Sequence, residues 1–385
     1  MHSPAAIPLP PGRGERVLVA MSGGVDSSVA AALLLERGYH VQGLTMLLWR
    51  DPLAGEGDAV ERAKGVCAQL GIPHHTLDLR EVFYRRVVEP FGQEYARGRT
   101  PNPCVRCNQQ LKFALLLDHA RELGGDYLAT GHYARIARDA EGYHLLCGLD
   151  ARKDQSYFLY GLDQERLGRL LLPLGTWRKE QVRAMARRRQ LAVVDRSESQ
   201  DLCFLGGRDY RAWMRERFPE AVRPGPILDR RGRRLGTHQG LPMYTIGQRE
   251  GLGIAAPRPL YVLALDVARN ALIVGHAEEL GWDSLLAAEM SYVAGHPPAE
   301  GAAVEAKIRY RARRAPARVW PLADGRARIV FAKPLRDITP GQAVVLYRGE
   351  RVLGGGIIAR VPGQDDAHLD LSSLPRPDRP ANSYP

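Results

Sequence analysis

A glycine-containing turn near the N-terminus has the pattern of a phosphate-binding site. The apolar run 17–21 predicts a buried strand, Ser22-Gly23-Gly24 interrupts it, and a helical pattern follows from Asp26. Glycine lets the backbone approach an anion closely, and the unpaired N–H groups at a helix N-terminus point toward it. We therefore expect this turn to hold the phosphates of a nucleotide. A plain strand-to-helix turn, capped by a serine or by Asp26, is the structural alternative.

The turn does not end in the Gly-Lys-Ser/Thr of a Walker A loop, which argues against a kinase-like grip on the terminal phosphate. Residues 22–27, Ser-Gly-Gly-Val-Asp-Ser, resemble instead the pyrophosphate loop of the ATP-pyrophosphatases. These enzymes split ATP into AMP and pyrophosphate and adenylate a substrate. In such a loop Asp26 either caps its helix or helps to place Mg²⁺.

Cysteines are the second group of residues that could carry chemistry. Cys104 and Cys107 follow Pro101 and Pro103, which predicts a rigid loop that leads into a helix from residue 107. A thiol at a helix N-terminus between Arg106 and Lys112 should ionise readily and act as a nucleophile. A zinc knuckle is the structural alternative, but no second Cys-x-x-Cys or His pair follows at zinc spacing. Cys203 is the third candidate, whereas Cys67 and Cys147 lie in apolar settings and are expected to be inert.

Length and composition bound the class of protein. A chain of 385 residues is expected to form two or three domains. A net charge of +11 favours a polyanionic partner such as nucleic acid, although only six of the 54 basic residues are lysine and this arginine bias weakens the argument. No apolar run reaches membrane-spanning length, and the proline-rich N-terminus is unlike a signal peptide. Because no run could span a membrane, we expect no membrane partner. Five unevenly spaced cysteines do not form the disulfide framework of a secreted protein and indicate a reducing cytoplasm.

The elements that must position these residues follow an alternating pattern. Strands are predicted near 17–21, 41–48, 74–79 and 126–130, and helices near 26–37, 58–70, 80–97, 107–123 and 180–189. This order predicts an α/β fold with a doubly wound parallel sheet and ligands at the carboxyl ends of its strands.

After Cys203 the pattern changes to short strands separated by glycine and proline. The runs 261–266 and 271–274 belong to a small β-rich region, and five runs between 303 and 358 suggest a small barrel. We predict a disordered tail (1–14), a nucleotide-binding domain (15–208), a central β-rich domain (209–278), a C-terminal β-barrel (279–363) and a flexible tail (364–385).

Taken together, these motifs resemble one family, the bacterial tRNA-specific 2-thiouridylases (the MnmA or TrmU family). The resemblance covers about residues 16–360 and lies in segments 22–28, 98–103, 107–108, 129–134, 153–160, 203–204, 238–241, 247–249, 251–254, 309–311 and 353–358. The family uses ATP and a relayed persulfide sulfur to replace O2 of the wobble uridine in certain tRNAs. A persulfide donor protein is therefore implied as a partner.

The resemblance also implies roles for single residues. Those expected to bind ATP are Ala20, Met21, Ser22, Gly23, Gly24, Val25, Asp26 and Ser27, with Met46 and Gly131 lining the nucleotide pocket. Those expected to contact tRNA are Asn102, Pro103, Cys104, His132, Lys153, Asp154, Gln155, Arg309, Tyr310 and Gln342. Cys107 would be the nucleophile and Cys203 the persulfide carrier, and the two would end the cycle as a disulfide.

Several alternatives stay open. Some family members carry Asp where this chain has Cys104, so Cys104, Cys107 and Cys203 could instead hold a 4Fe–4S cluster with one open iron. We favour the persulfide route, in which Cys104 is a spare thiol or a partner in a local disulfide. An ordinary loop histidine is the structural alternative for His132. The arginine runs 187–189 and 230–234 are more readily explained as solvated faces than as specific RNA contacts.

Two other functions compete with sulfur transfer. One is an amide-forming synthetase that adenylates a small substrate, although the chain has no glutaminase signature. The other is a non-catalytic RNA-binding module with a vestigial nucleotide loop, against which the intact loop and the paired cysteines argue.

Overall fold

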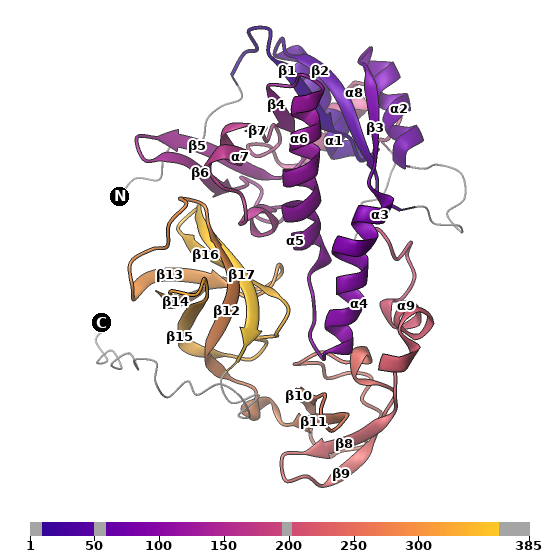
Figure 1. Cartoon of the computed structure of the whole chain (residues 1–385), viewed down its shortest axis with the longest axis vertical. Helices are drawn as coiled ribbons and strands as arrows, with labels where there is room; N and C mark the ends of the chain where they lie inside the picture. The colour runs from indigo at the N-terminus through magenta and orange to yellow at the C-terminus, as the bar shows by residue number, and fades with distance from the viewer. Residues whose placement is uncertain (1–9, 50–58, 195–201, 362–385) are drawn as a thin grey trace.

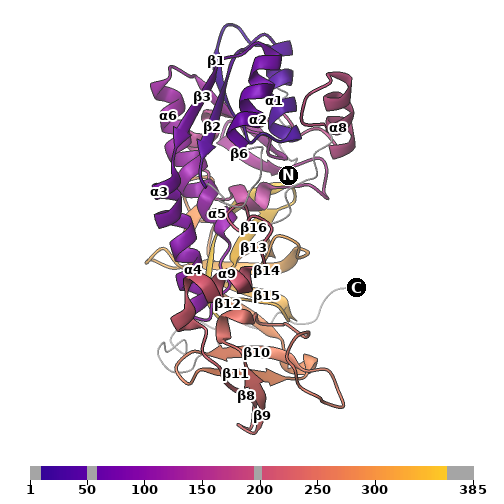
Figure 2. The ribbon, with the colours of Figure 1, turned by 90° about the vertical axis from the view of Figure 1, so that its right-hand side faces the viewer.

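The computed structural model describes residues 10–49, 59–194 and 202–361. Most of the predicted N-terminal tail (1–14) and all of the predicted C-terminal tail (364–385) lie outside these residues. Along the long axis, the nucleotide-binding unit lies at one end, the barrel in the middle and a second small sheet at the other end (Figures 1 and 2).

The nucleotide-binding unit is built on a five-stranded parallel sheet in the order β3-β2-β1-β4-β7. Its strands are β1 (Arg16–Ala20), β2 (His40–Leu47), β3 (His74–Asp78), β4 (Tyr127–Ala129) and β7 (Leu170–Leu171). Successive side chains of a strand face opposite ways, so Val17 and Val19 pack in one core with residues of α1 (Val25–Glu36), α2 (Ala59–Leu70) and α8 (Lys179–Arg188). Leu18 packs on the other face against α6 (Leu116–Glu122). The predicted doubly wound sheet is confirmed.

The cysteine pair lies in a helix, and the predicted loop was wrong. The chain runs continuously through α5 (Pro103–Cys107), the π-helix η2 (Asn108–Leu115) and α6. Pro103 occupies the first turn of α5, where its missing N–H costs nothing, and Asn102 Oδ1 accepts a hydrogen bond from the Val105 N–H (3.4 Å). A second continuous helical segment runs in the opposite direction (Figure 1). It consists of α3 (Arg80–Phe83), the π-helix η1 (Tyr84–Val88) and α4 (Glu89–Ala96).

The central region holds a small sheet in the order β10-β11-β8-β9. Its strands are β8 (Gly225–Asp229), β9 (Arg234–His238), β10 (Tyr261–Asp266) and β11 (Ala271–Gly275), with short helical turns η4 (Pro219–Ala221), η5 (Leu241–Met243) and η6 (Ala277–Glu279). The β-rich prediction for this region is confirmed, but the helix α9 (Tyr210–Arg217) was not predicted. Its buried Trp213 and Met214 share a hydrophobic cluster with Phe91 of α4.

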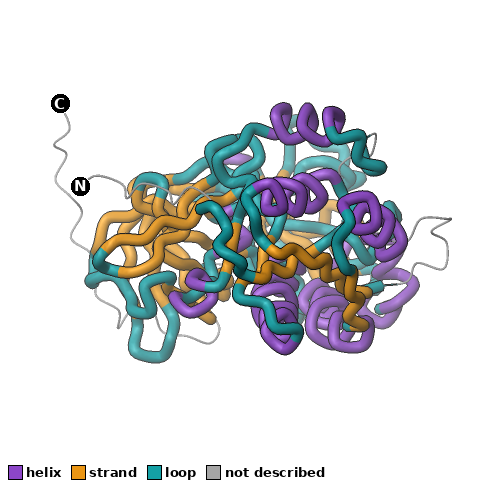
Figure 3. The backbone as a smooth tube through the Cα atoms, turned by 90° about the horizontal axis from the view of Figure 1, so that it is seen from above, coloured by secondary structure: helices purple, strands orange, loops and turns teal. Residues whose placement is uncertain are grey.

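Six antiparallel strands form the C-terminal barrel in the order β12-β15-β14-β13-β16-β17, and a β12–β17 pairing closes it. They are β12 (Trp282–Tyr292), β13 (Ala302–Lys307), β14 (Ala315–Pro321), β15 (Ala327–Leu335), β16 (Ala343–Arg348) and β17 (Arg351–Arg360). The hairpin of β5 (Ala134–Asp139) and β6 (Gly142–Cys147), which the sequence pattern did not reveal, joins β17 through the Arg351–Leu146 pair. Figure 3 shows the barrel strands beside the helices of the nucleotide-binding unit.

The barrel and the nucleotide-binding unit share one hydrophobic core. Leu18 and Leu116 belong to the same cluster as Val345 and Ile357 of the barrel. The segment that holds η3 (Ser156–Leu159) and α7 (Gln164–Gly168) lies at this junction. There the buried Tyr157 donates a hydrogen bond to the Ala343 carbonyl (2.9 Å). The two units are therefore held in a fixed relation.

None of the described helices combines the length and the apolar character needed to cross a membrane.

We expect Tyr157→Phe to lower the free energy of unfolding by about 1–3 kcal/mol, because the buried Ala343 carbonyl loses its donor. Chemical denaturation followed by tryptophan fluorescence measures the change. Tyr84→Phe is the matched control, since Tyr84 is 40% exposed. Equal stability of the two variants would show that this hydrogen bond does not hold the units together.

Candidate active site

The phosphate loop lies between β1 and α1, at the point where the strand order reverses from β2 to β4. Ligands bind in this crevice in open α/β sheets. Gly24 precedes the first residue of α1 and offers no side chain to cap it, so the N–H groups of the first turn face outward to an anion. Ser22 N–H donates to Ser27 Oγ (3.2 Å), which holds the loop closed on the helix.

Glycines allow the close approaches around this loop. Gly23 has a φ of +65°, and a Cβ there would lie 2.7 Å from the Ala59 carbonyl oxygen and 3.0 Å from the Arg62 side chain. At Gly131, in the turn after β4, a Cβ would lie 2.8 Å from Ser27 N. The turn after β4 therefore packs directly on the phosphate loop, as the predicted shared nucleotide pocket requires.

The other predicted ATP residues contribute in different ways. Met21 and Val25 are buried in the core, so only their backbone reaches the loop surface. Ala20 and Met46 are partly buried at the carboxyl ends of β1 and β2, where they pack on the core shared with the barrel. They face the same cluster as Tyr310 of the predicted tRNA-contacting set.

Asp26 is bonded to two side chains that the sequence analysis did not pair with it. It does not cap α1; both of its oxygens lie 2.7 Å from Lys179 Nζ, and Tyr133 Oη donates to Oδ1 (2.8 Å). The Lys179 ammonium also lies 5.7 Å from the Tyr133 ring centre. Sequence reasoning missed Lys179 and Tyr133. The available signal was the lysine itself, which is rare in this arginine-rich chain.

The fold brings Cys104, Cys107 and Cys203 together, although Cys203 is distant in the sequence. Cys107 belongs to the same hydrophobic cluster as Phe204 and Leu205, the two residues that follow Cys203. The Phe204 ring makes edge-to-face contacts with Phe91 and Trp213, with ring centres 5.2 and 5.7 Å apart. Negative charge on Cys104 or Cys107 would disfavour ionisation of Cys203. This repulsion shows that the three sulfur atoms lie close to one another.

The expectation that these thiols ionise readily was wrong for this state of the protein. Although Cys104 and Cys203 reach solvent, burial among protein atoms raises the pKa of all three thiols, and that of Cys203 to about 12. Lys112 opposes the shift by electrostatic attraction but does not overcome it. Desolvation therefore outweighs the nearby cation.

The described residues contain one set of three potential metal ligands with all donor atoms within 4.8 Å of one another, Asp139, Glu141 and His144. The carboxylates of Asp139 and Glu141 pair with Arg351. The three cysteines are not such a set, so in this conformation they do not form a ready-made site for a single ion.

The other two cysteines are buried. Burial raises the pKa of Cys67 to about 11, in agreement with an inert core residue. Cys147 lies in a hydrophobic cluster as predicted, but its setting is not purely apolar, because its sulfur accepts hydrogen bonds from Arg314 Nη2 (2.6 Å) and Ser156 Oγ (3.6 Å).

Four of the predicted tRNA-contacting side chains already have partners inside the protein. The Asp154 carboxylate is buried and accepts hydrogen bonds from the Gly148 and Ser156 N–H groups (3.0 and 3.1 Å). The remaining three are Asn102, Gln155 and Gln342. Asn102 caps α5, and Gln155 Oε1 accepts a hydrogen bond from the Tyr133 N–H (3.0 Å). Gln342 Nε2 donates one to the Thr100 carbonyl (2.9 Å). These side chains shape the loops around the cysteines, and a direct side-chain contact of Asp154 with RNA does not fit its burial.

His132 follows the glycine that packs on the phosphate loop, and Lys112 acts electrostatically on both its imidazole and the Cys107 thiol. Its Nδ1 lies 2.8 Å from Thr130 Oγ1, and its ring lies 5.8 Å from that of Phe113. Burial, with a smaller contribution from Lys112, lowers the pKa of His132 to about 3. The imidazole is therefore neutral at physiological pH and can serve as a hydrogen-bonding group.

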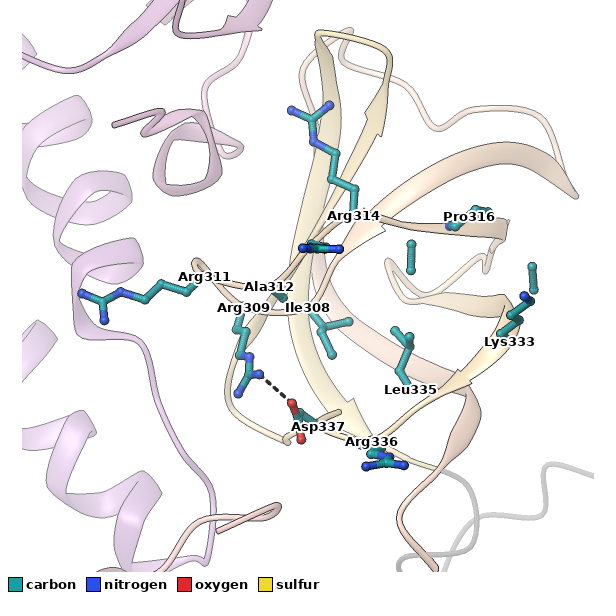
Figure 4. A pocket seen from close by; sticks show the side chains of 13 residues that line it. Ile308, Arg309, Arg311, Ala312, Arg314, Pro316, Lys333, Leu335, Arg336 and Asp337 are labelled. Carbon is teal, nitrogen blue, oxygen red and sulfur yellow. Dashed lines mark hydrogen bonds and ion pairs between the residues drawn. The ribbon is translucent and has the colours of Figure 1, made fainter. Parts of the chain in front are cut away.

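A strongly cationic hollow of about 640 Å³ lies on the barrel (Figure 4). Its charged lining residues are Arg309, Arg311, Arg313, Arg314, Lys333, Arg336 and Asp337. Arg309 pairs with Asp337 (2.5 Å), whereas Arg311 extends from the barrel toward the nucleotide-binding unit. Tyr310 packs on Phe158 with ring centres 4.5 Å apart. Of the predicted tRNA residues of the barrel, Arg309 lines this hollow, whose cationic side chains are suited to phosphates, whereas Tyr310 and Gln342 are not among its lining residues.

Comparison with known proteins covers nearly the whole described chain. Residues 15–207 match the family described as tRNA methyl transferase HUP domain, residues 212–276 the tRNA methyl transferase PRC-barrel domain, and residues 282–358 the aminomethyltransferase beta-barrel domain. The chain is 51% identical over 370 residues to a protein named tRNA-specific 2-thiouridylase MnmA from Roseiflexus sp. (90% of this chain, 99% of that protein). It is 52% identical over 345 residues to the protein of that name from Desulforudis audaxviator (89% and 98%).

A solved 4-thiouridine synthetase–RNA complex with bound ATP is similar over 55% of this chain and 53% of that chain, at 18% identity and a TM-score of 0.35.

Because its pKa is raised to about 12, Cys203 should react slowly with iodoacetamide in the substrate-free protein. We expect the rate to climb about tenfold per pH unit from roughly pH 7 to 9.5 without levelling, whereas a free thiol levels off near its pKa of about 8.5. Peptide mass spectrometry of timed samples measures the rate, with free cysteine as the reference. A plateau near the pH at which the free thiol levels off would contradict the raised pKa.

Proposed function

Because the chain belongs to the family of the tRNA-specific 2-thiouridylases, we propose that it uses ATP to replace O2 of the wobble uridine of tRNA with sulfur. The observation that carries this proposal is a group of three cysteines around Lys112, whose charge also acts on the neutral His132, the residue after the glycine that packs on the phosphate loop. A cytoplasmic location, a tRNA with a modifiable wobble uridine and a persulfide donor protein as partners are parts of the same proposal.

The first step activates the base. Uridine O2 is a poor leaving group, so it attacks the α-phosphorus of ATP; the bond between the α- and β-phosphates breaks and pyrophosphate leaves with the electron pair. The N–H groups at the start of α1, with Ser22 and Ser27, bind the phosphates. Gly131 and Met46 border the rest of the nucleotide.

The second step delivers sulfur. The terminal sulfur of a persulfide on Cys203 attacks C2 of the adenylated uridine, and AMP leaves with the C2–O2 bond electrons. Cys107 then attacks Cys203 Sγ, so a Cys107–Cys203 disulfide forms and the electron pair of the broken S–S bond completes the thiocarbonyl. An external dithiol reduces the disulfide, and the persulfide donor reloads Cys203. The raised pKa values favour protonated thiols until a substrate or donor changes their surroundings.

Two groups implied by the family call for separate treatment. Three cysteine thiolates are a suitable donor set for a 4Fe–4S cluster, which when bound would supply an open iron for sulfide; Cys104, Cys107 and Cys203 would hold it. Mg²⁺ is expected to accompany ATP. However, the carboxylate of the phosphate loop, Asp26, is engaged by Lys179, so the ligand-free loop does not fit a Mg²⁺ ligand at this position.

We propose domain bounds of 15–208 for the nucleotide-binding domain, 209–278 for the central domain and 279–363 for the barrel. The barrel and the Lys153–Gln155 loop would contact tRNA, with the cationic hollow as the phosphate-binding surface. An amide-forming synthetase would leave the cysteine group without a role.

Cysteine variants separate the two sulfur routes. In the persulfide route, Cys107→Ser and Cys203→Ser lose tRNA thiolation, whereas Cys104→Asp and Cys104→Ala keep it in air without bound iron, because Cys104 does not touch sulfur in transit. Mass spectrometry of tRNA nucleosides and iron analysis of the protein are the measurements. Joint loss of iron and activity in Cys104→Ala would establish the cluster route, and activity in Cys203→Ser would exclude both.

Removing charge from the cationic hollow should weaken tRNA binding. We expect Arg311→Met/Lys333→Met to lower the slope of log affinity against log salt by about two, because each variant residue gives up one phosphate contact. Arg269→Met is the control, since Arg269 is exposed on the central sheet and pairs with Asp266. An unchanged slope, measured by filter binding at several salt concentrations, would remove the hollow from the RNA surface.

A further inference from the structure

The phosphate loop lacks a lysine of its own, but the fold brings one to it from α8. Lys179 is the first residue of α8, and its side chain is 9% exposed. Its Nζ lies 2.7 Å from both oxygens of Asp26, which is in the first turn of α1. The backbone N–H of Lys179 donates to Asp150 Oδ2 (3.0 Å), which fixes the start of α8 in place. A buried ammonium is therefore held next to the N–H groups that face the phosphates.

Stability is a weak explanation for this ion pair. The cost of desolvating two charges often exceeds their attraction, so replacing a buried pair with apolar side chains is frequently neutral or stabilising. Asp26 is also already favoured by the positive end of α1 and by the hydrogen bond from Tyr133 Oη. The arrangement is better explained by the anion site itself, where a lone carboxylate would repel the phosphates and a lysine attracts them.

The choice of lysine points the same way. Only six of the 54 basic residues of this chain are lysine, and the residue before Lys179 is an arginine. The lysine ammonium is a compact point charge whose donors can rotate, so it can turn from a carboxylate oxygen to a phosphate oxygen. The arginine guanidinium is flat and rigid and suits a fixed bidentate contact instead. Position 179 suits the lysine ammonium, since the amine lies between the Asp26 carboxylate and the Tyr133 ring.

We infer that Lys179 binds the pyrophosphate portion of ATP and stabilises it as it leaves, while Asp26 and Tyr133 position the ammonium. The inference rests on the proposed adenylation. In that step uridine O2 bonds to the α-phosphorus, the bridging oxygen departs with pyrophosphate, and its new negative charge develops beside Lys179. Lys179 thereby supplies from α8 the cation that a Walker A lysine supplies from within its own loop.

The test compares ATP with AMP, which has no pyrophosphate portion. We expect Lys179→Met to weaken ATP binding roughly 10- to 100-fold, as the loss of a charged hydrogen bond predicts, and to leave AMP binding within about twofold. Calorimetry without tRNA gives both affinities. Lys64→Met is the matched control, because Lys64 forms an exposed pair with Glu61 and should bind both nucleotides as the wild type does. A parallel fall of both affinities in Lys179→Met would mean a structural role and overturn the inference.

A double variant separates phosphate binding from simple neutralisation of Asp26. If Lys179 only balances that charge, Asp26→Asn/Lys179→Met will bind ATP like the wild type, which would overturn the inference. If Lys179 contacts phosphate, the double variant will recover only the affinity that the unpaired Asp26 carboxylate cost, so it will still bind ATP several-fold more weakly than the wild type, and tRNA-dependent pyrophosphate release will fall by on the order of 100-fold. Failure of the wild type to thiolate tRNA would refute the proposed function, while the ATP-to-AMP comparison would still decide the role of Lys179.

Discussion

The hydrophobic core shared by the parallel sheet and the barrel determines where the chemistry can take place. Leu18 beneath the phosphate loop and Val345 of the barrel belong to one buried cluster. The helical segment that carries Cys104 and Cys107 passes through the same region, since Val105 and Phe113 are buried in that cluster. Because cores pack densely and deform little, the loop, the cysteines and the barrel are fixed relative to one another.

A second set of contacts ties the barrel to the residues just before the cysteines. The Thr100 N–H donates to the Pro340 carbonyl (2.9 Å), and Gln342 Nε2 donates to the Thr100 carbonyl. Gly341 has a φ of +93°, and a Cβ there would lie 2.9 Å from the Thr100 backbone, so only glycine allows this approach. The barrel and the segment that leads into the cysteine-bearing helix thus meet through backbone contacts, which hold together parts of the molecule that are separated by more than half of the chain.

Burial and helix geometry together set the character of the thiols. The π-helix η2 follows Cys107 directly, and its i→i+5 hydrogen-bonding pattern brings Lys112 toward the face of Cys107. The ammonium favours the thiolates, but desolvation is the larger effect and keeps their pKa values high. Because the thiolate is the reactive form of cysteine, a raised pKa lowers the reactivity of these thiols.

Local patterns in the sequence were sufficient for the alternating sheet, the phosphate loop and the barrel strands, because strand and helix periodicities and glycine turns are encoded within short windows. The same local patterns predicted a loop at Pro103-Cys104, where the proline in fact begins a helix. They also missed the β5–β6 hairpin and α9, because these elements are stabilised by distant partners such as β17 and Phe91. Only the tertiary structure placed Lys179 on Asp26, buried Asp154 and grouped Cys203 with Cys107. Residue types and spacing determine which chemistry is available, whereas burial and contacts between distant segments decide which side chains meet and which charge they carry.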